Sequence, residues 1–188
     1  MNWLSEGPSR GQRLQFFYET YRPFKDAAGL RYTGQVVRAN WDGYYPLSPT
    51  VLAARWSEGR GQNGKTEPFQ LGGSGSLIES MAPQLNERDI ALRGYRTGEP
   101  LLRGINARRA TLEWRIPIAD IDRHAMVPPV GINRVSTALF YEGGGTWTSG
   151  GGPERWFRAA GIELLDDLRL GYVFGIRLRI GVAWASTP

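Results

Sequence analysis

The sequence predicts an all-β protein, and two observations support this prediction. Polar and apolar residues alternate with a period of two through most of the chain, which is typical of strands with one polar and one apolar face. Apolar residues at helical spacing are nearly absent. The chain has 188 residues and no internal repeat or linker-like segment, so we expect a single domain over residues 1–188.

The first third of the chain contains three expected strands. Alternation predicts strands over Leu14–Arg22 and Thr50–Ser57, and a strand with weaker alternation over Leu30–Trp41. Tyr44–Pro46 and Ser48–Pro49 contain the residues typical of turns. We therefore expect a turn between the second and third strands.

A long loop is expected next, at about residues 58–104. From Glu58 to Gly104 the alternation gives way to Gly, Ser, Pro and polar residues. A loop of more than about forty residues inside a compact domain is too long for an incidental connection and indicates a function. A short helical turn near Leu77–Met81 is the one regular element expected in it.

The second half of the chain predicts four further strands, over Ala107–Ile118, Arg134–Glu142, Ala159–Leu165 and Phe174–Trp184. The end of the third is open, because alternation continues toward Tyr172. In the other three, the charged residues share one face and leave the opposite face uncharged. These charged residues are Arg109, Glu113, Arg115, Arg134, Glu142, Arg177 and Arg179.

This pattern fits two kinds of protein. In a soluble sandwich or barrel the apolar face packs into the core and the polar face meets water. In a transmembrane β-barrel the apolar face meets lipid, and a charge there costs about 2–4 kcal/mol near the bilayer midplane. Such strands do not produce the run of roughly 18 apolar residues that marks a membrane helix, and this chain has no such run. Alternation alone favours the soluble protein.

Composition argues against several functions. The net charge is +5, but the arginines are scattered singly and form no basic run, which disfavours nucleic-acid binding. There is no cysteine and one histidine, His124, expected in a turn before Pro128–Pro129, so a histidine metal cluster or a Cys–His pair cannot be built. Asp166–Asp167 is expected in a turn. We therefore expect no enzyme activity, metal or cofactor.

Two glycine-rich segments, 72–76 and 143–145, invite comparison with phosphate-binding loops. Neither ends in Gly-Lys-Ser/Thr and neither lies between a strand and a helix, so both are interpreted as ordinary loops.

Three short motifs follow one another in order. Leu92-Arg93-Gly94-Tyr95 lies near the end of the long loop, Glu113-Trp114-Arg115-Ile116-Pro117 closes the next strand, and Phe140-Tyr141-Glu142-Gly143-Gly144 ends the strand after it. In this order they resemble the C-terminal half of the outer-membrane assembly barrels, the BamA, TamA and two-partner-secretion (FhaC-like) superfamily, also called bacterial surface antigens. The resemblance covers roughly residues 30–184.

The resemblance implies how these residues interact. In the superfamily the arginine of the loop motif folds back inside the barrel and meets an acidic residue on a strand, here Glu142 in place of Asp. Arg93 and Glu142 are thus expected to fix the loop in a structural or gating role. Gly94 would allow close backbone approach and Tyr95 would pack beside it. Phe140 and Gly144 belong to the same site. The alternative is a plain turn with an exposed arginine.

Glu113 and Arg115 lie two residues apart on one strand face and could extend this polar network inside the barrel. The alternative, an ordinary solvated charged face, is equally compatible with the sequence.

The resemblance also implies fold and function. About seven strands of about ten residues each can be placed, so we expect a partial antiparallel transmembrane β-barrel with a long inward-folded loop. The implied location is the bacterial outer membrane and the implied role is insertion or translocation of β-rich client proteins, or a barrel anchor for a fused domain. Implied partners are outer-membrane lipid, client proteins and the rest of the barrel.

The N-terminal segment has neither the basic nor the apolar region of a signal peptide, so the expectation is a fragment without its signal peptide, periplasmic domains and final strand. The alternative function is a soluble β-barrel or sandwich that binds a ligand through the long loop.

Overall fold

The protein is all-β, in agreement with the prediction. The computed structural model describes residues 9–21, 24–25, 29, 31–62, 65–73, 88–125, 130–170 and 174–186. Among these residues the helical structure is limited to one 3₁₀ turn, Pro100–Leu102. None of the described helical structure is long and apolar enough to cross a membrane.

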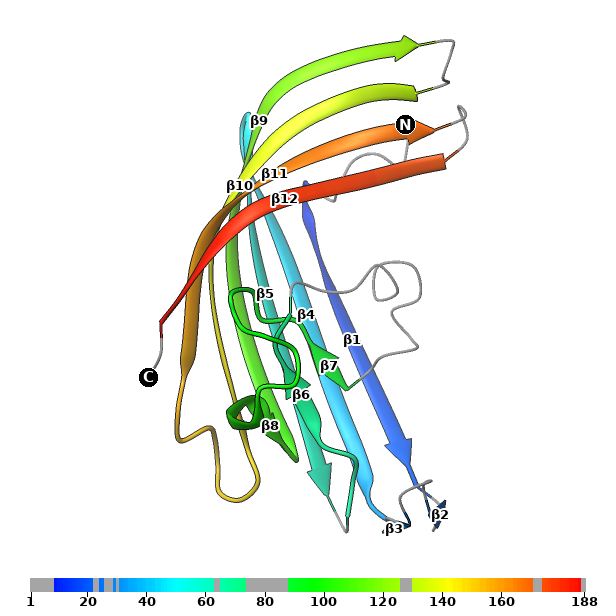
Figure 1. The fold of residues 1–188 in the computed structure, drawn as a ribbon, viewed down its shortest axis with the longest axis vertical. Coiled ribbons are helices and arrows are strands. Elements are labelled where there is room, and N and C mark those ends of the chain that lie inside the picture. Colours follow the sequence, from blue (N-terminus) through cyan, green and yellow to red (C-terminus); the bar gives the residue numbers. More distant parts are fainter. Residues whose placement is uncertain are drawn as a thin grey trace.

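A seven-stranded antiparallel sheet dominates the molecule, with the strand order β1-β4-β5-β9-β10-β11-β12 (Figure 1). Each strand pairs with its sequence neighbours in this sheet, so the topology is a meander. Its strands are β1 Gly11–Thr20, β4 Gln35–Leu47, β5 Thr50–Gln62, β9 Asn106–Ala125, β10 Val130–Trp147, β11 Phe157–Leu170 and β12 Phe174–Ser186. The prediction of about seven strands is confirmed.

The connections differ between the two ends of the sheet. The β4–β5, β9–β10 and β11–β12 connections are short, at residues 48–49, 126–129 and 171–173. The connections at the opposite end are longer, at residues 21–34, 63–105 and 148–156. A small pair, β2 (Phe24–Lys25) with β3 (Arg31–Tyr32), belongs to the first of these longer connections.

The sequence placed the β4–β5 turn too early. β4 begins at Gln35, after the expected Leu30, and it continues through Tyr44–Pro46, which were expected in the turn. Pro46 is compatible with a strand here because β1 pairs with β4 only as far as Tyr44, so no β1 partner needs a Pro46 amide hydrogen. The turn is confined to Ser48–Pro49.

Four segments expected as loops or turns belong to strands. β5 continues over residues 58–62, so the long loop starts at residue 63. Gly143–Gly145 lie inside β10, Asp166–Asp167 inside β11, and His124 inside β9. Pairing with both neighbouring strands holds Gly143, Gly144 and the two aspartates in extended backbone despite their low strand propensity, and Gly145 pairs with β9. The side chain of His124 and the expected helical turn at residues 77–81 lie outside the described residues.

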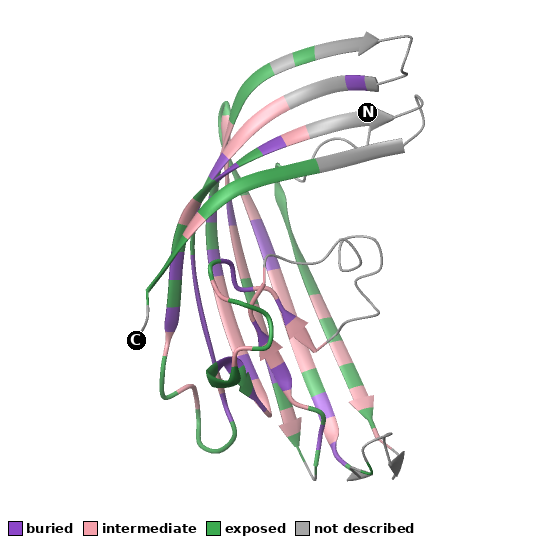
Figure 2. Cartoon of the chain, viewed as in Figure 1, coloured by how far each residue is buried: buried purple, intermediate pink, exposed green. Residues whose placement is uncertain are grey.

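The two faces of the sheet differ as the alternation predicted. Along β9 the residues Thr111 and Glu113 are buried, whereas Leu112 and Trp114 between them are exposed. Figure 2 shows this alternation of buried and exposed residues along the strands. We call the face that carries Glu113 the inner face and the opposite one the outer face.

The described parts of the long loop, residues 65–73 and 88–105, pack on the inner face (Figure 1). The loop contains three short strands that form a separate sheet, β6 (Phe69–Leu71), β7 (Asp89–Ile90) and β8 (Arg103–Gly104). Its apolar side chains form a cluster with residues of the main sheet. The cluster comprises Val36, Phe69, Leu71, Ile90, Leu92, Leu102, Ala107 and Phe157.

Glycines on the inner face make room for this loop. The ring of Phe69 occupies the space where a side chain at Gly59 in β5 would lie. A Cβ at Gly144 in β10 would lie 2.7 Å from Leu71 Cδ2. On the outer face of β5, Glu58 and Arg60 follow Trp56 in place of apolar residues, so the apolar alternation stops before the strand does. This explains why the sequence did not predict the end of β5.

Candidate functional site

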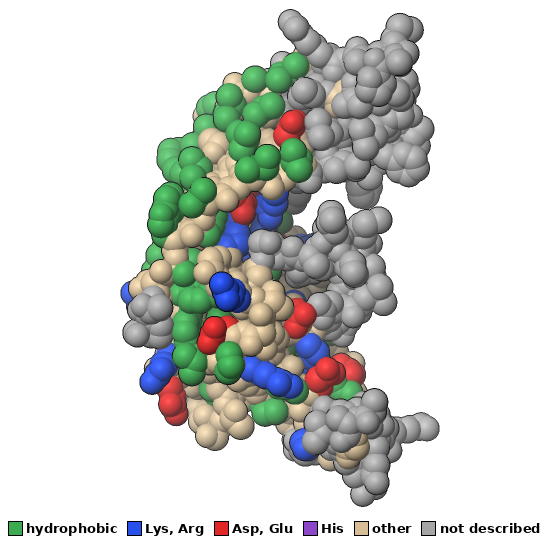
Figure 3. All heavy atoms as spheres, viewed as in Figure 1, with side chains coloured by type: hydrophobic (Ala, Val, Ile, Leu, Met, Phe, Trp, Pro, Cys, Tyr) green, Lys and Arg blue, Asp and Glu red, His purple; other side chains and the backbone are tan. Residues whose placement is uncertain are grey.

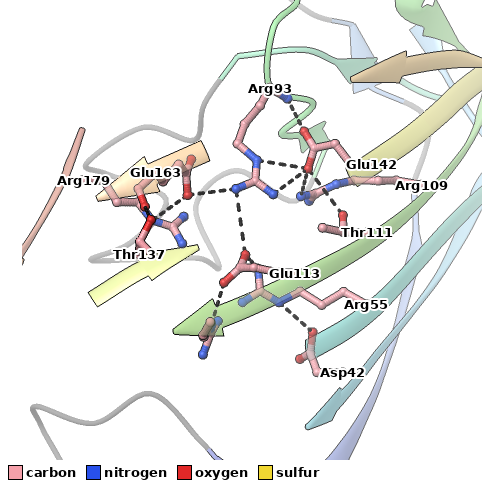
Figure 4. Close-up of polar contacts among 11 residues, drawn as sticks. Asp42, Arg55, Arg93, Arg109, Thr111, Glu113, Thr137, Glu142, Glu163 and Arg179 are labelled. Carbon is pink, nitrogen blue, oxygen red and sulfur yellow. Dashed lines mark hydrogen bonds and ion pairs between the residues drawn. The ribbon is translucent and has the colours of Figure 1, made fainter. Parts of the chain in front are cut away.

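Arg93 is the centre of a buried polar cluster between the loop and strands β9–β11 (Figure 4). A tight turn positions its backbone. Leu92 forms an isolated β-bridge with Gly73, and Gly94 has a positive φ of 86°. The Arg93 side chain is 5% exposed, and the Glu142 side chain is fully buried. The expected contact between these two residues is therefore present, and Arg93 is not an exposed turn residue.

Glu142 accepts several hydrogen bonds from the arginine. Arg93 Nη2 and Nε lie 2.9 and 3.1 Å from Glu142 Oε2, and the Arg93 backbone N–H donates to Oε1. Arg109 Nη2 donates to Oε2 at 3.1 Å, and the Thr111 hydroxyl lies 3.5 Å from the same oxygen. The carboxylate thus has two cationic partners, and one of them comes from the sheet itself.

Arg93 also reaches two further carboxylates. Its Nη1 lies 2.9 Å from Glu163 Oε2 and 3.8 Å from Glu113 Oε2. Neither approach has hydrogen-bond geometry, so these are ion pairs only. Burial by itself lowers the pKa of Arg93, but the negative charges of Glu142 and Glu163 outweigh it and raise the pKa. Arg93 stays charged in this cluster.

The residues close to Arg93 and Glu142 in their two motifs also take part in the site. The guanidinium carbon lies 3.5 Å from the centre of the Phe140 ring, a cation–π contact. A Cβ at Gly94 would lie 3.1 Å from the Ala185 Cβ, so Gly94 allows the loop to approach β12. Gly144, two residues after Glu142, leaves room for Leu71 of the loop.

Tyr95 fixes the loop to the last two strands. Its hydroxyl lies 2.8 Å from the Arg158 carbonyl and 2.5 Å from the Ser186 carbonyl, and it accepts a bond from the Arg158 N–H at 3.1 Å. Its ring meets Phe157 edge-on, with 5.5 Å between centroids. Burial raises the pKa of the hydroxyl, which therefore remains a donor at neutral pH.

Glu113 and Arg115 extend the cluster, as the sequence suggested. Arg115 Nε donates to Glu113 Oε1 at 2.6 Å, and Glu113 is 1% exposed. Arg55 Nη1 lies 3.7 Å from Glu113 Oε2. This pair therefore belongs to a buried network and not to a solvated face.

Charges of opposite sign continue along the inner face to both edges of the sheet. Asp42 in β4 lies between Arg13 of β1, at 2.7 Å, and Arg55 of β5, at 3.9 Å. On the other side Arg179 of β12 lies 3.6 Å from Glu163 of β11. We call this set the charged row; it consists of Arg13, Asp42, Arg55, Glu113, Arg93, Glu142, Glu163 and Arg179.

Sequence reasoning did not assign Arg13, Asp42 or Glu163 to the site. Glu163 lies on the polar face of an expected strand, whereas Arg13 and Asp42 lie one residue outside the expected strands Leu14–Arg22 and Leu30–Trp41. The proximity of the charges depends on strand register. Arg13 is opposite Asp42, and Asp42 is opposite Arg55. Pairing in register was the missing information.

A second arginine of the loop was also missed. Arg88 Nη2 lies 2.6 Å from Glu19 Oε2 on β1, and its guanidinium stacks near Tyr21 and Phe69 at 5.6 and 5.2 Å from the ring centres. The loop is thus attached to β1, to the centre of the sheet and to β12.

The outer face carries many exposed apolar side chains, which Figure 3 shows in green along one side of the molecule. Toward the end with the long connections, Arg108 lies 5.3 Å from the Trp56 ring centre and 3.0 Å from Glu58. Large apolar side chains exposed on this face include Leu14, Phe16, Tyr18, Tyr45, Trp56, Leu112, Trp114, Leu139, Tyr141, Ile162, Leu164, Leu178, Ile180, Val182 and Trp184.

Among the described residues, no group of three or more acidic or histidine side chains is arranged to hold a metal ion. No protein-family model, no curated protein and no solved structure matches the chain.

Proposed function

We propose that this chain is part of the wall of a transmembrane β-barrel in the bacterial outer membrane, of the assembly and secretion superfamily that its motifs resemble. One observation carries the proposal: the sheet has its apolar side chains exposed on the outer face and its charges buried on the inner face. A soluble sandwich has the reverse arrangement, with apolar residues in the core. A patch of this extent is unusual on a soluble monomer.

The length of the uncharged stretch on the outer face is close to the length of strand that crosses a bilayer. On β9 the outer face is uncharged from Ala110 to Ile118, close to the roughly ten residues that a tilted strand needs to cross. Trp56, Tyr141 and Trp184 lie near one border of this zone, and Arg108 lies beyond it. Aromatic girdles at the borders of the apolar band are typical of outer-membrane barrels. Short turns at one end and long connections at the other are typical as well.

The assignment to the assembly superfamily rests on the Arg93 cluster. The contact of Arg93 with Glu142 is the one that the resemblance implies for an inward-folded loop. The loop packs on the inner face of the proposed barrel wall. We therefore propose a role in inserting or translocating β-rich proteins, in which the Arg93 cluster holds the loop in position. The cluster is structural and takes part in no covalent chemistry.

The experiment compares arginine substitutions on the two faces of neighbouring strands. Leu112→Arg places a charge on the outer face, and Ser136→Arg places one on the inner face, where Ser136 is only half-buried. Thr111 is unsuitable as the inner control because it is buried against Glu142. Leu112→Arg should cost about 2–4 kcal/mol and reduce assembly into membranes, whereas Ser136→Arg should assemble as the unsubstituted chain does.

The readout is the fraction of protein that resists alkaline extraction from the outer membrane of a bacterial host. If both variants assemble equally, or if the chain is monodisperse in buffer without detergent, the membrane proposal is wrong. The soluble ligand-binding module is then the remaining function.

A further inference from the structure

We infer that the two edges of the sheet accept antiparallel strands that carry a carboxylate on the inner face, and that a second copy of this chain does not fit them. The inference rests on the proposed membrane function and concerns what completes the wall. Its evidence is the charged row and the direction of the edge strands.

The charged row ends in a cation at both edges. Within the described residues, Arg55 has an acidic partner on each side, Asp42 and Glu113. Arg13 on β1 has Asp42 on one side only and is 64% exposed. Arg179 on β12 has Glu163 on one side only and is 39% exposed. An acidic residue on each adjoining strand would give Arg13 and Arg179 a second acidic neighbour, as Arg55 has.

The edges also present what a pairing strand requires. Among the described residues β1 and β12 each pair with one strand of the sheet, so no described strand pairs with the other edge of either. In a bilayer the backbone groups of such an edge must be paired within protein. The outward side chains of both edges, such as Phe16 and Ile180, are apolar and exposed, so the added strand needs an apolar outer face as well.

Strand direction and charge both argue against a second copy. All neighbours in the seven-stranded sheet are antiparallel, so β1 and β12 run in the same direction. A second copy inserted in the same orientation would pair β12 with β1 in parallel, whereas outer-membrane barrels have antiparallel strands. It would also bring Arg179 and Arg13 to one seam with no acid between them. An antiparallel complement for both edges has an odd number of strands.

The test uses the full chain in detergent micelles and synthetic strand peptides of about ten residues. The peptides alternate leucine and serine, carry a cysteine near the N-terminus, and differ at one inner-face position, glutamate or lysine. Because the chain has no cysteine, Trp184→Cys near the end of β12 and Leu178→Cys six residues before it provide two separate capture sites on the β12 edge. Disulfide capture is quantified by mass spectrometry.

The glutamate peptide should be captured about tenfold more than the lysine peptide, and Arg179→Glu should reverse this preference. Capture should occur at Trp184→Cys rather than Leu178→Cys, because the N-terminus of an antiparallel strand lies beside the end of β12. Equal capture of both peptides, capture of neither, a preference that Arg179→Glu does not reverse, or capture at Leu178→Cys would each overturn the inference.

A further control tests pairing between two copies of the chain. The double variant Phe16→Cys, Ile180→Cys should give no dimer joined through positions 16 and 180, and such a dimer would show that a second copy does fit. These outcomes are separate from the proposed function, because a chain that needs detergent and is integrated in membranes can still fail the peptide test.

Discussion

Two arginines attach the long loop to the sheet with similar contacts in different surroundings. Arg93 and Arg88 each pair with a glutamate and lie over an aromatic ring. The side chains of Arg93 and Glu142 are 5% and 0% exposed, whereas those of Arg88 and Glu19 are 12% and 42% exposed. Removing one partner of a buried ion pair costs several kcal/mol, whereas a pair open to solvent contributes little. Burial, and not the number of contacts, should therefore decide how strongly each arginine holds the loop.

The largest effect is expected at Glu142. Glu142→Gln keeps the size of the side chain but leaves Arg93 and Arg109 without the carboxylate they share. The free energy of unfolding in micelles should fall by about 3–5 kcal/mol. Urea titration followed by tryptophan fluorescence measures this, with Glu154→Gln, at an exposed position, as the matched control. A loss no larger than that of the control would show that the cluster does not stabilise the protein.

A smaller effect is expected when the arginine is removed instead. In Arg93→Ala, Glu142 keeps Arg109 and Glu163 keeps Arg179, so no carboxylate is left without a cation. We expect a loss of about 2 kcal/mol, release of the loop, and an intact sheet. Limited proteolysis should cut the loop while strand content by circular dichroism is unchanged.

Arg93→Lys is the control for geometry, since it keeps the charge but not the planar fork of donors. Its free energy of unfolding and its resistance to loop cleavage should lie between those of the unsubstituted chain and those of Arg93→Ala. Loss of strand content together with loop cleavage would show that the loop and the sheet unfold as one unit.

Tyr95 tests the attachment to β12, with an intermediate expected effect. Tyr95→Phe removes the hydroxyl that bridges Arg158 and Ser186 but keeps the edge contact with Phe157. A loss of about 1 kcal/mol is expected. The Arg158 amide, which donates to this hydroxyl, should exchange hydrogen faster in the variant. Unchanged exchange at Arg158 would show that the hydroxyl does not hold the loop at this edge.

The difference between the two arginines also shows what sequence can reveal. Strand faces, the Arg93–Glu142 contact and the Glu113–Arg115 pair followed from alternation and motif order, because these features are local or repeat a known pattern. Arg88 has no motif around it, and its partner Glu19 is 69 positions away. The same holds for Asp42, whose two arginines are brought to it by strand register. Gly59 and Gly143 looked like loop residues because their role is to admit the rings of Phe69 and Trp156, and this packing leaves no mark in the alternation.

The smallest effect is expected at Arg88. Arg88→Ala removes an ion pair with Glu19, which is partly open to solvent, and the stacking near Tyr21 and Phe69. Screening by water limits the ion pair to about 0.5 kcal/mol, and cation–π contacts of partly exposed groups add about as much. The free energy of unfolding should therefore fall by about 1 kcal/mol or less. Urea titration at low and high salt separates the two contributions, because salt screens the ion pair more than the stacking. Arg88→Lys keeps the charge and loses most of the stacking, and it should retain the salt dependence that Arg88→Ala loses. If Arg88→Ala destabilised the protein as much as Glu142→Gln, burial would not be what distinguishes the two attachments.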